Sequence, residues 1–269
     1  MNFSQQTYIF RITYAILTKQ GNPSERIPPE IKNGRDFGIM HTFKEILHKY
    51  GHGLLMCYLF FYLVWFFYLE NRDVPDYYIM HCKLDDWIPF NEWFVIPYCL
   101  WFVYIAATVL YFFFSSVGSS RKEYYQVCGF LFGGMTICLF IYTFWPSMQD
   151  LRPQVLPRDN FLTKIVAGFY AGDTCTNVCP SIHVYNSIGA CIAILRSERL
   201  KKKKIVRTGS VILSVLICLS TVFIKQHSVL DMLAAAGLAL VMYLVSYPMP
   251  ELIQKKKTDT LLAESENLS

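Results

Sequence analysis

Charged residues are scarce in this chain of 269 residues, and several long stretches have almost none. Asp, Glu, Lys and Arg make up 17% of the residues, whereas a soluble globular domain carries about a quarter. Hydrophobic residues make up 54%, the mean hydropathy is +0.30, and apolar runs approaching the ~20 residues that span a bilayer recur along the sequence. The shortage of charge excludes an ordinary soluble domain and predicts a polytopic membrane protein.

Two further signals are missing. The first twenty residues lack the basic start, the uninterrupted apolar core and the small-residue cleavage pattern of a signal peptide, so we do not expect one there. The net charge of +5 does not indicate a nucleic-acid partner, because Lys and Arg cluster beside the apolar runs, where membrane orientation explains them.

The apolar runs predict an all-α fold of six transmembrane helices preceded by one or two interfacial helices. Residues 1–53 are expected to form cytoplasmic or interfacial N-terminal helices, 54–247 the catalytic six-span domain, and 248–269 a disordered cytoplasmic tail. The longest polar stretch between spans is 146–179. The expected spans cover about 54–69, 94–114, 124–145, 182–195, 209–224 and 227–247.

The basic residues set the expected orientation. Nineteen of the 25 Lys and Arg residues fall in 1–53, the 115–123 linker, the 196–207 loop or the tail, and six fall in the loops of the other side. Cytoplasmic loops carry the excess of Lys and Arg, so both termini are predicted to be cytoplasmic. We therefore expect a multi-pass protein of the plasma membrane whose active site is extracytoplasmic.

Three polar clusters adjoin the apolar runs. His227 and Asp231 are four residues apart, so on a helix they share a face, and the carboxylate can hold one imidazole nitrogen while the other acts as nucleophile or base. Ser181 and His183 follow Pro180 at a predicted helix start, whose free N–H groups attract phosphate. Arg152 supplies a guanidinium that can bind two phosphate oxygens at once. Together they predict phosphoryl transfer at a membrane surface.

Arg-Pro, Pro-Ser-x-His and His-x-x-x-Asp, in this order within a six-span bundle, resemble the type 2 phosphatidic acid phosphatase superfamily. That superfamily includes lipid phosphate phosphatases, and its relatives include the sphingomyelin and inositol phosphorylceramide synthases. The resemblance implies that His227 is a nucleophile that forms a phosphohistidine, that Asp231 orients it, and that His183 is the general acid. It also implies that Ser181 and Arg152 bind phosphate, with no metal or other cofactor.

The chain departs from the family pattern at three positions. Trp145 stands where the family has a Lys, and Thr221 where it has an Arg, so two usual phosphate-binding cations are missing. Lys225 can replace one of them, and Ile182 replaces a usual Gly. A pocket with fewer cations suits a singly charged phosphodiester better than a dianionic monoester, which favours the transferase side of the family.

The predicted function is an integral-membrane lipid phosphatase or phosphotransferase that acts on a phosphorylated lipid at the outer leaflet through a phosphohistidine. Two alternatives stay open: a phosphodiester headgroup transferase of the sphingomyelin or inositol phosphorylceramide synthase type, and a catalytically inactive relative that binds or transports lipid. Chemically, His183, His227 and Asp231 could also form a metal site. His183 as a structural histidine and Arg152 as an interfacial anchor are simpler interpretations. The sequence does not identify the lipid headgroup, the acceptor or the oligomeric state.

The cysteines and two adjacent acids also allow predictions. Six of the nine cysteines lie in apolar runs and are expected to be buried thiols. Cys175 and Cys179 lie on the predicted oxidising side, where we hypothesise a disulfide between them. Asp85 and Asp86 are expected to be solvated and to take no part in the chemistry.

Overall fold

The structure is a computed structural model, and it describes residue 45 and residues 47–248. The chain forms two compact units, Met1–His48 and Lys49–Ser269, and the architecture below is that of the second unit as far as residue 248. The interfacial helices predicted within 1–53 fall almost entirely outside the described residues. The predicted disordered tail also lies outside them, except for residue 248.

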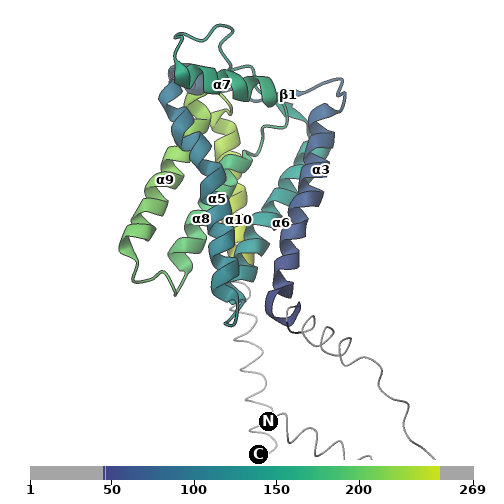
Figure 1. Cartoon of the computed structure of the whole chain (residues 1–269). Helices are drawn as coiled ribbons and strands as arrows, with labels where there is room; N and C mark the ends of the chain where they lie inside the picture. The colour runs from purple at the N-terminus through teal and green to yellow at the C-terminus, as the bar shows by residue number, and fades with distance from the viewer. Residues whose placement is uncertain (1–44, 46, 249–269) are drawn as a thin grey trace, which may run out of the picture. The chain divides into compact units, whose positions relative to one another are not determined.

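Five helical segments of the described chain are long and apolar enough to cross a membrane, and they run side by side as a bundle (Figure 1). Each coincides with an apolar run of the sequence, so a mostly helical membrane fold is confirmed. The helices of these segments are Tyr58–Asn71 (α3, preceded by the 3-10 helix η1 at Gly51–Cys57), Val95–Ser116 (α5), Lys122–Phe144 (α6), Lys204–Phe223 (α9) and Val229–Ser246 (α10).

The fourth predicted span differs from the others. It forms α8 (Ile182–Arg196), whose 15 residues extend about 22 Å, less than the ~30 Å thickness of a hydrocarbon core. α8 packs against α5, α6, α9 and α10, so much of its surface meets protein, and buried polar residues such as Asn186 and Ser187 are tolerated there. The predicted count of six membrane-crossing helices is therefore not confirmed.

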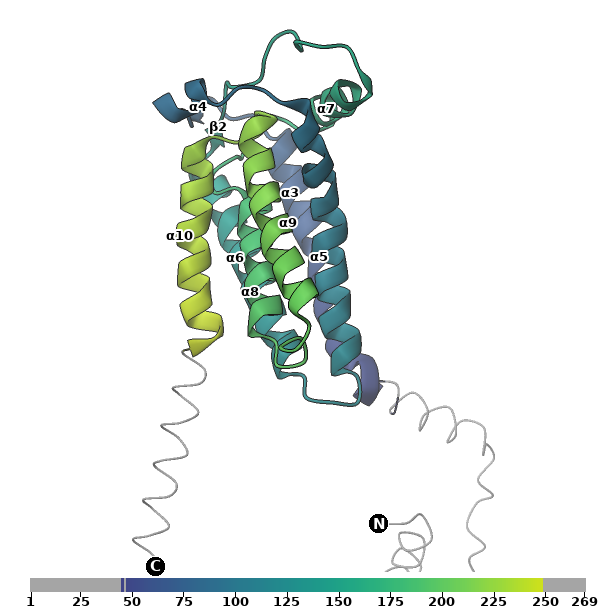
Figure 2. The same cartoon turned by 90° about the vertical axis from the view of Figure 1, so that its left-hand side faces the viewer.

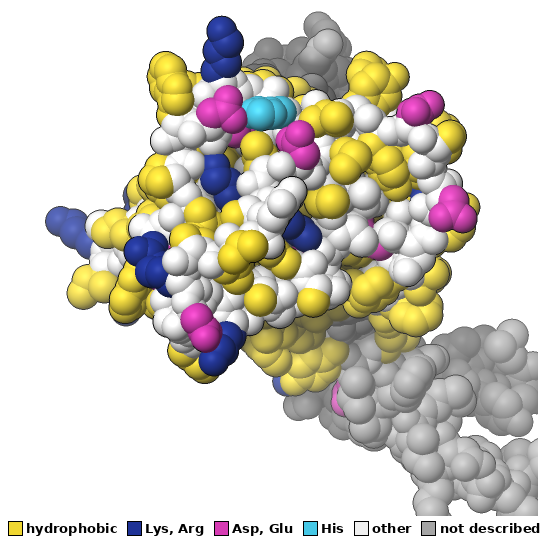
Figure 3. Space-filling view, turned by 90° about the horizontal axis from the view of Figure 1, so that it is seen from above, with side chains coloured by type: hydrophobic (Ala, Val, Ile, Leu, Met, Phe, Trp, Pro, Cys, Tyr) yellow, Lys and Arg dark blue, Asp and Glu magenta, His cyan; other side chains and the backbone are white. Residues whose placement is uncertain are grey.

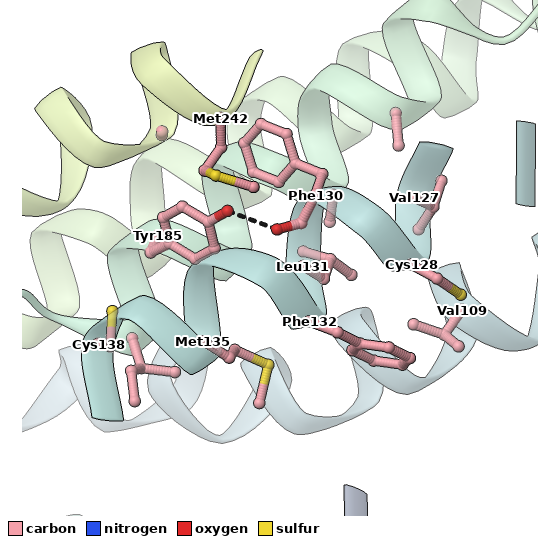
Figure 4. Packing of buried hydrophobic residues seen from close by; sticks show 14 of the residues in the cluster. Val109, Val127, Cys128, Phe130, Leu131, Phe132, Met135, Cys138, Tyr185 and Met242 are labelled. Atoms are coloured by element: carbon pink, nitrogen blue, oxygen red, sulfur yellow. Dashed lines mark hydrogen bonds between the residues drawn. The ribbon is translucent and has the colours of Figure 1, made fainter. Parts of the chain in front are cut away.

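α6 and α8 pack against each other through buried side chains (Figure 4). Tyr185 of α8 donates a hydrogen bond of 2.6 Å from its hydroxyl to the carbonyl of Phe130 in α6 and stacks on the Phe130 ring. Met242 of α10 belongs to the same buried cluster. Gly134 makes room for the tyrosine, because a Cβ at position 134 would overlap the Tyr185 ring. This packing fixes α8, which carries the Pro-Ser-x-His segment at its N-terminus.

Several segments between the long helices gather at one end of the bundle, where α7 (Phe161–Gly172) lies across the helix ends (Figures 1 and 2). There β1 (Tyr78–Ile79) pairs in parallel with β2 (Ser147–Met148). The short helices at this end are α4 (Lys83–Trp87) and the 3-10 helix η2 (Glu92–Phe94), which contacts α5, α7 and α9. We call this the motif end, because the segments that carry Arg152, Ser181 and His227 meet there. Figure 3 looks down on it and shows charges of both signs among hydrophobic and uncharged side chains.

α7 lies within the polar stretch 146–179, for which no helix was predicted. The Asn160 side chain accepts a hydrogen bond from the Thr163 N–H (3.0 Å), and the Thr163 hydroxyl accepts one from the Asn160 N–H (2.9 Å), which together form a capping box. Apolar residues then recur at helical spacing, and they pack on α5 and on the turn before α10. They are Leu162, Ile165, Val166 and Phe169, and their partners are Val95, Tyr98 and Ile224.

The linkers 117–121 and 197–203 lie at the opposite end of the bundle (Figures 1 and 2). The two ends thus separate the described loops into the two groups that the basic-residue count distinguishes. The side of a membrane that each end faces stays a prediction.

Candidate active site

Ser181 begins α8 as its N-cap. Its hydroxyl accepts a hydrogen bond from the Val184 N–H (3.4 Å), and its own N–H donates to the Asp231 carbonyl (3.2 Å). On the other side, the Tyr142 hydroxyl of α6 donates to the Pro180 carbonyl. Ser181 satisfies one of the free N–H groups of the helix start, as its predicted position requires. The Pro-Ser-x-His segment is thereby joined to the start of α10.

His227 lies in the turn before α10 and not in the helix. The Thr221 carbonyl accepts hydrogen bonds from the N–H groups of Gln226 (2.9 Å) and His227 (3.1 Å), which closes this turn. Ser228 is the N-cap of α10, and the Asp231 carboxylate accepts from the Ser228 N–H (2.9 Å) in a capping box. The expectation that His227 and Asp231 share a helix face is therefore corrected, since the turn brings the histidine to the carboxylate.

Asp231 faces His227 with 3.4 Å between its Oδ2 and the histidine Nδ1. This distance exceeds that of an ordinary N–H···O hydrogen bond. The two side chains are therefore within ion-pair distance but are not hydrogen-bonded to each other. Asp231 is completely buried and His227 is 8% exposed. Because Nδ1 faces the carboxylate, Nε2 is the nitrogen left to act on a ligand.

His183 approaches His227 from α8, and their ring centroids are 5.8 Å apart. Two aromatic rings of α5 flank His183: Tyr98 stacks on it at 4.6 Å between centroids, and Trp101 packs at 4.3 Å. Two histidines from separate motifs therefore meet, as the sequence predicts. The aromatic rings beside His183 were not foreseen, because nothing in their own spacing distinguishes them from other residues of an apolar run.

Asp85 is buried, which corrects the expectation that it is solvated. Its carboxylate accepts hydrogen bonds from the Ser228 hydroxyl (2.6 Å), the Val229 N–H (2.8 Å) and the Cys82 N–H (2.8 Å). Burial alone would raise the pKa of Asp85, but these hydrogen bonds outweigh it and hold the pKa below its usual value. Asp85 thus holds the N-terminus of α10, where a negative charge also suits the helix dipole. Its neighbour Asp86 is exposed, as expected.

Lys225 points towards α4. Its ammonium donates to the carbonyls of Asp85 (2.7 Å) and Ile88 (2.6 Å). Burial lowers the pKa of Lys225, while the charges of Asp85 and Asp86 oppose this shift. The residue has a φ of 52°, a left-handed conformation that costs a non-glycine residue about 1–2 kcal/mol. These contacts favour a role in holding α4 against the His227 turn.

Arg152 is held at the C-terminal end of α7. Its guanidinium donates to the carbonyls of Tyr170 (3.3 Å), Asp173 (2.9 Å) and Thr174 (2.9 Å), and to the side-chain oxygen of Gln226 (2.5 Å). The guanidinium also lies over the Tyr170 ring. Both terminal nitrogens are therefore already engaged, and Gln226 links the guanidinium to the residue beside His227.

The three positions that depart from the family pattern supply no charge. Trp145 is exposed and packs on Tyr78, with ring centroids 4.8 Å apart. Thr221 is buried and contributes the carbonyl that closes the His227 turn. Ile182 is nearly buried at the first position of α8.

A cavity of about 730 Å³ begins at the two histidines and extends between α3, α5 and α6. Its walls on these helices are mainly apolar and aromatic, and the side formed by η1 and α3 runs from Met56 to Phe67, roughly 17 Å of helix. Leu63 on α3 and Phe102 on α5 line the cavity and are also exposed, so it opens sideways between these two helices. Both are candidate membrane helices, so this opening faces hydrocarbon if they span the bilayer.

The polar part of the cavity lies at the motif end. None of the described residues that line it is Lys or Arg, and Asp173 is the carboxylate among them. Five of the lining side chains have a buried polar atom without a hydrogen-bond partner: Trp101 Nε1, Asn177 Oδ1, Asn186 Oδ1, Gln226 Nε2 and His227 Nδ1. Buried polar atoms are nearly always hydrogen-bonded in proteins, so water or a polar ligand at this end of the cavity would complete their hydrogen bonding.

The hypothesised disulfide is not formed, since all nine cysteines, each within the described residues, are free. The backbone of this segment is instead bound to residues 147–149. The Gln149 N–H donates to the Cys175 carbonyl (2.9 Å), and the Cys179 N–H donates to the Ser147 hydroxyl (3.0 Å). Burial and the negative charge of Asp231 raise the pKa of Cys179 to about 12, which keeps it a thiol at neutral pH.

Within residues 45 and 47–248, no group of three or more His, Cys, Asp or Glu side chains is arranged to hold a metal ion. The alternative set of His183, His227 and Asp231 does not form such a group.

Residues 127–255 match the model of the PAP2 superfamily. The matched segment begins in α6 and includes all three motifs, from Arg152 to Asp231. This match confirms the resemblance that the motifs carry. Comparisons with curated proteins and with solved structures gave no match. The match to the PAP2 superfamily and the apolar helices fit a membrane lipid phosphatase.

Proposed function

We propose that this protein is an integral-membrane lipid phosphatase or phosphotransferase in which His227 is the nucleophile. The observation that most supports this proposal is the meeting of His183 and His227 at the polar end of an apolar cavity, with Asp231 beside His227. The match to the PAP2 superfamily supports the reaction class.

In the proposed reaction, Nε2 of His227 attacks phosphorus and forms a P–N bond while the bond from phosphorus to the leaving oxygen breaks. His183 gives its proton to that oxygen, and Asp231 stabilises the positive charge that develops on His227. In the second step, water or an alcohol oxygen attacks phosphorus and the P–N bond breaks. His183 takes the proton of the attacking group and returns to its starting state.

Phosphate binding falls to groups near the two histidines. The N–H groups at the start of α8, with Ser181 as N-cap, form an anion site of the usual kind, and Gln226 Nε2 is a buried donor that lacks a partner. We assign Arg152 and Lys225 to positioning, because their terminal nitrogens bind backbone carbonyls and, for Arg152, the Gln226 oxygen. Arg152 then affects phosphate through Gln226.

The lining of the cavity favours the phosphodiester alternative. A dianionic monoester needs several positive charges around it, and no described lining residue is Lys or Arg. A headgroup transferase that moves a singly charged group to an alcohol acceptor is therefore the second candidate. For either reaction we propose the outer leaflet, because the motif end carries the six basic residues of the predicted extracytoplasmic side.

The test uses purified wild-type protein and the variants His227→Ala, Asp231→Asn and His183→Ala, with His81→Ala, an exposed histidine of the motif end, as a matched control. Monoester and diester lipids labelled in the phosphate are supplied, and released phosphate, new lipids and acid-labile phosphoprotein are measured. His227→Ala should abolish turnover and phosphoprotein. Asp231→Asn should lower turnover by about 10³- to 10⁴-fold, the effect of losing the orienting carboxylate of a catalytic histidine.

His183→Ala should regain activity on a nitrophenyl phosphodiester, whose leaving group needs no proton. Full activity of His227→Ala would refute the mechanism. Wild-type protein that binds lipid, turns none over and forms no phosphoprotein would instead establish the inactive, lipid-binding alternative.

A further inference from the structure

This inference rests on the proposed function and names the substrate class of the same site. We propose that the group esterified to the substrate's phosphate carries an ammonium, which binds at Asp173 and Asn177 in the polar part of the cavity. The substrate is then a zwitterionic phosphodiester lipid.

The charge balance of the cavity leads to this conclusion. No described lining residue is Lys or Arg, yet Asp173 lines the same space, and the Glu70 carboxylate is near enough to act on its charge. An anionic phosphodiester that entered alone would meet this negative charge in a partly desolvated site, where charges interact strongly. A ligand that also carries an ammonium has no net charge. Its ammonium faces the Asp173 carboxylate, while its phosphate faces the N–H groups at the start of α8.

Asp173 has the surroundings of a carboxylate that lacks a counter-ion. Burial, with Glu70 adding to it, raises the pKa of Asp173 above its usual range. Arg152 and His227 oppose the shift, but the hydrogen bond from Arg152 goes to the backbone carbonyl of residue 173. A bound ammonium would supply the missing positive charge.

Asn177 is the independent observation that points to a ligand. Its Nδ2 donates to Glu70 Oε1 (2.8 Å) and to the Leu69 carbonyl (3.3 Å), which fixes the orientation of the amide. Its Oδ1 is buried without a partner, although the residue is 5% exposed and lines the cavity. An acceptor held in this way matches an N–H donor or the polarised methyl groups of a quaternary ammonium.

Aromatic rings line the same cavity. Phe66 and Phe169 line the cavity, close in sequence to Glu70 and Asp173 respectively. Aromatic faces attract ammonium groups through cation–π interactions. A divalent cation is a poorer fit, since Glu70 already accepts a hydrogen bond from Asn177 and the described residues include no cluster of three ionisable ligands.

The experiment compares phosphodiester lipids with identical tails and with choline, ethanolamine or glycerol headgroups. Wild-type protein, Asp173→Asn and the control Asp159→Asn, an exposed acid of the same motif end, are assayed for kcat/KM in EDTA. Wild-type and control should prefer an ammonium lipid over the glycerol lipid by about 10- to 100-fold, the value of a hydrogen bond to a charged group. Asp173→Asn should lose most of this preference.

A binding measurement with the His227→Ala variant, which cannot form the proposed intermediate, tests the ammonium subsite in the absence of turnover. The choline or ethanolamine lipid should bind at least about 10-fold more tightly than the glycerol lipid, and a second substitution, Asp173→Asn, should remove the difference. Equal affinity or equal kcat/KM for all three lipids would overturn the subsite and leave the phosphohistidine mechanism standing. Preference that appears only with added calcium or magnesium would also overturn it. Turnover that survives in His227→Ala would refute the mechanism while leaving the binding preference intact.

Discussion

The substitution Asp85→Asn tests whether a carboxylate far from the motifs in sequence holds the turn that carries His227. Asn keeps the shape of Asp85 but removes its charge and replaces one of the oxygens that accept from Ser228, Cys82 and Val229. At least one buried donor then loses its acceptor, and each such loss costs about 1–3 kcal/mol. We expect a fall of about 2–4 kcal/mol in the free energy of unfolding.

Activity should fall as well, because these donors lie beside His227. A displacement of about 1 Å in a catalytic group can lower the rate by ~10²-fold, so we expect a loss of about 10- to 100-fold in kcat. The neighbouring substitution Asp86→Asn is the matched control, since Asp86 is exposed and bonds His81. Thermal unfolding in detergent and turnover of a lipid substrate measure the two effects.

The dependence on pH follows from the direction of the pKa shift. The pKa of Asp85 is lower in the folded protein than its usual value, so its stabilisation is present above the unfolded pKa of about 3.9 and is lost as the pH falls through the folded pKa. The difference in Tm between wild-type and Asp85→Asn should therefore be constant near neutral pH and shrink below about pH 4. Equal Tm and equal kcat for Asp85→Asn and Asp86→Asn would refute this reasoning.

Three further predictions concern packing, topology and cysteine chemistry. Gly134→Ala should lower the free energy of unfolding by about 1–3 kcal/mol, because its Cβ overlaps the Tyr185 ring. Gly129→Ala on the same helix should not, because a Cβ there meets open space. Thermal unfolding of the two variants compares these effects. A cysteine at Asp159 should react with an impermeant thiol reagent in intact cells and one at Lys204 should not, as mass spectrometry of the labelled peptides can show; the reverse pattern contradicts the proposed orientation. Alkylation after denaturation without reductant should modify all nine cysteines, and a protected pair including Cys175 or Cys179 would show that a disulfide forms.

The sequence predicts the bundle well because each long helix needs a continuous apolar surface, and such runs are visible in one dimension. α8 is the instructive exception: other helices surround it, so it is short and contains Asn186 and Ser187 in buried positions. α7 was missed although Asn160 and Thr163 form a recognisable capping box, because polar residues on both sides of it dominate the 146–179 stretch.

The motifs correctly predict that the two histidines and Asp231 lie close together. They do not predict the direction in which the charged side chains point. Arg152 and Lys225 lie close to His227 in the fold, yet their terminal nitrogens bind backbone carbonyls. Asp85 was expected to be solvated but is buried, because the sequence does not distinguish it from the adjacent acid Asp86. Only the tertiary contact with Ser228 and Val229 distinguishes the buried one from Asp86.

The sideways opening of the cavity between α3 and α5 has a consequence for how a substrate arrives. A lipid tail that leaves a bilayer for water loses about 0.8 kcal/mol per methylene, so a chain of ~16 carbons would lose more than ~10 kcal/mol. A cavity with apolar walls on α3, α5 and α6 lets the tail exchange one hydrocarbon environment for another while the headgroup reaches the histidines. Encounter then becomes diffusion in two dimensions, and the rate follows the mole fraction of the lipid in the membrane instead of its concentration in the bulk solution.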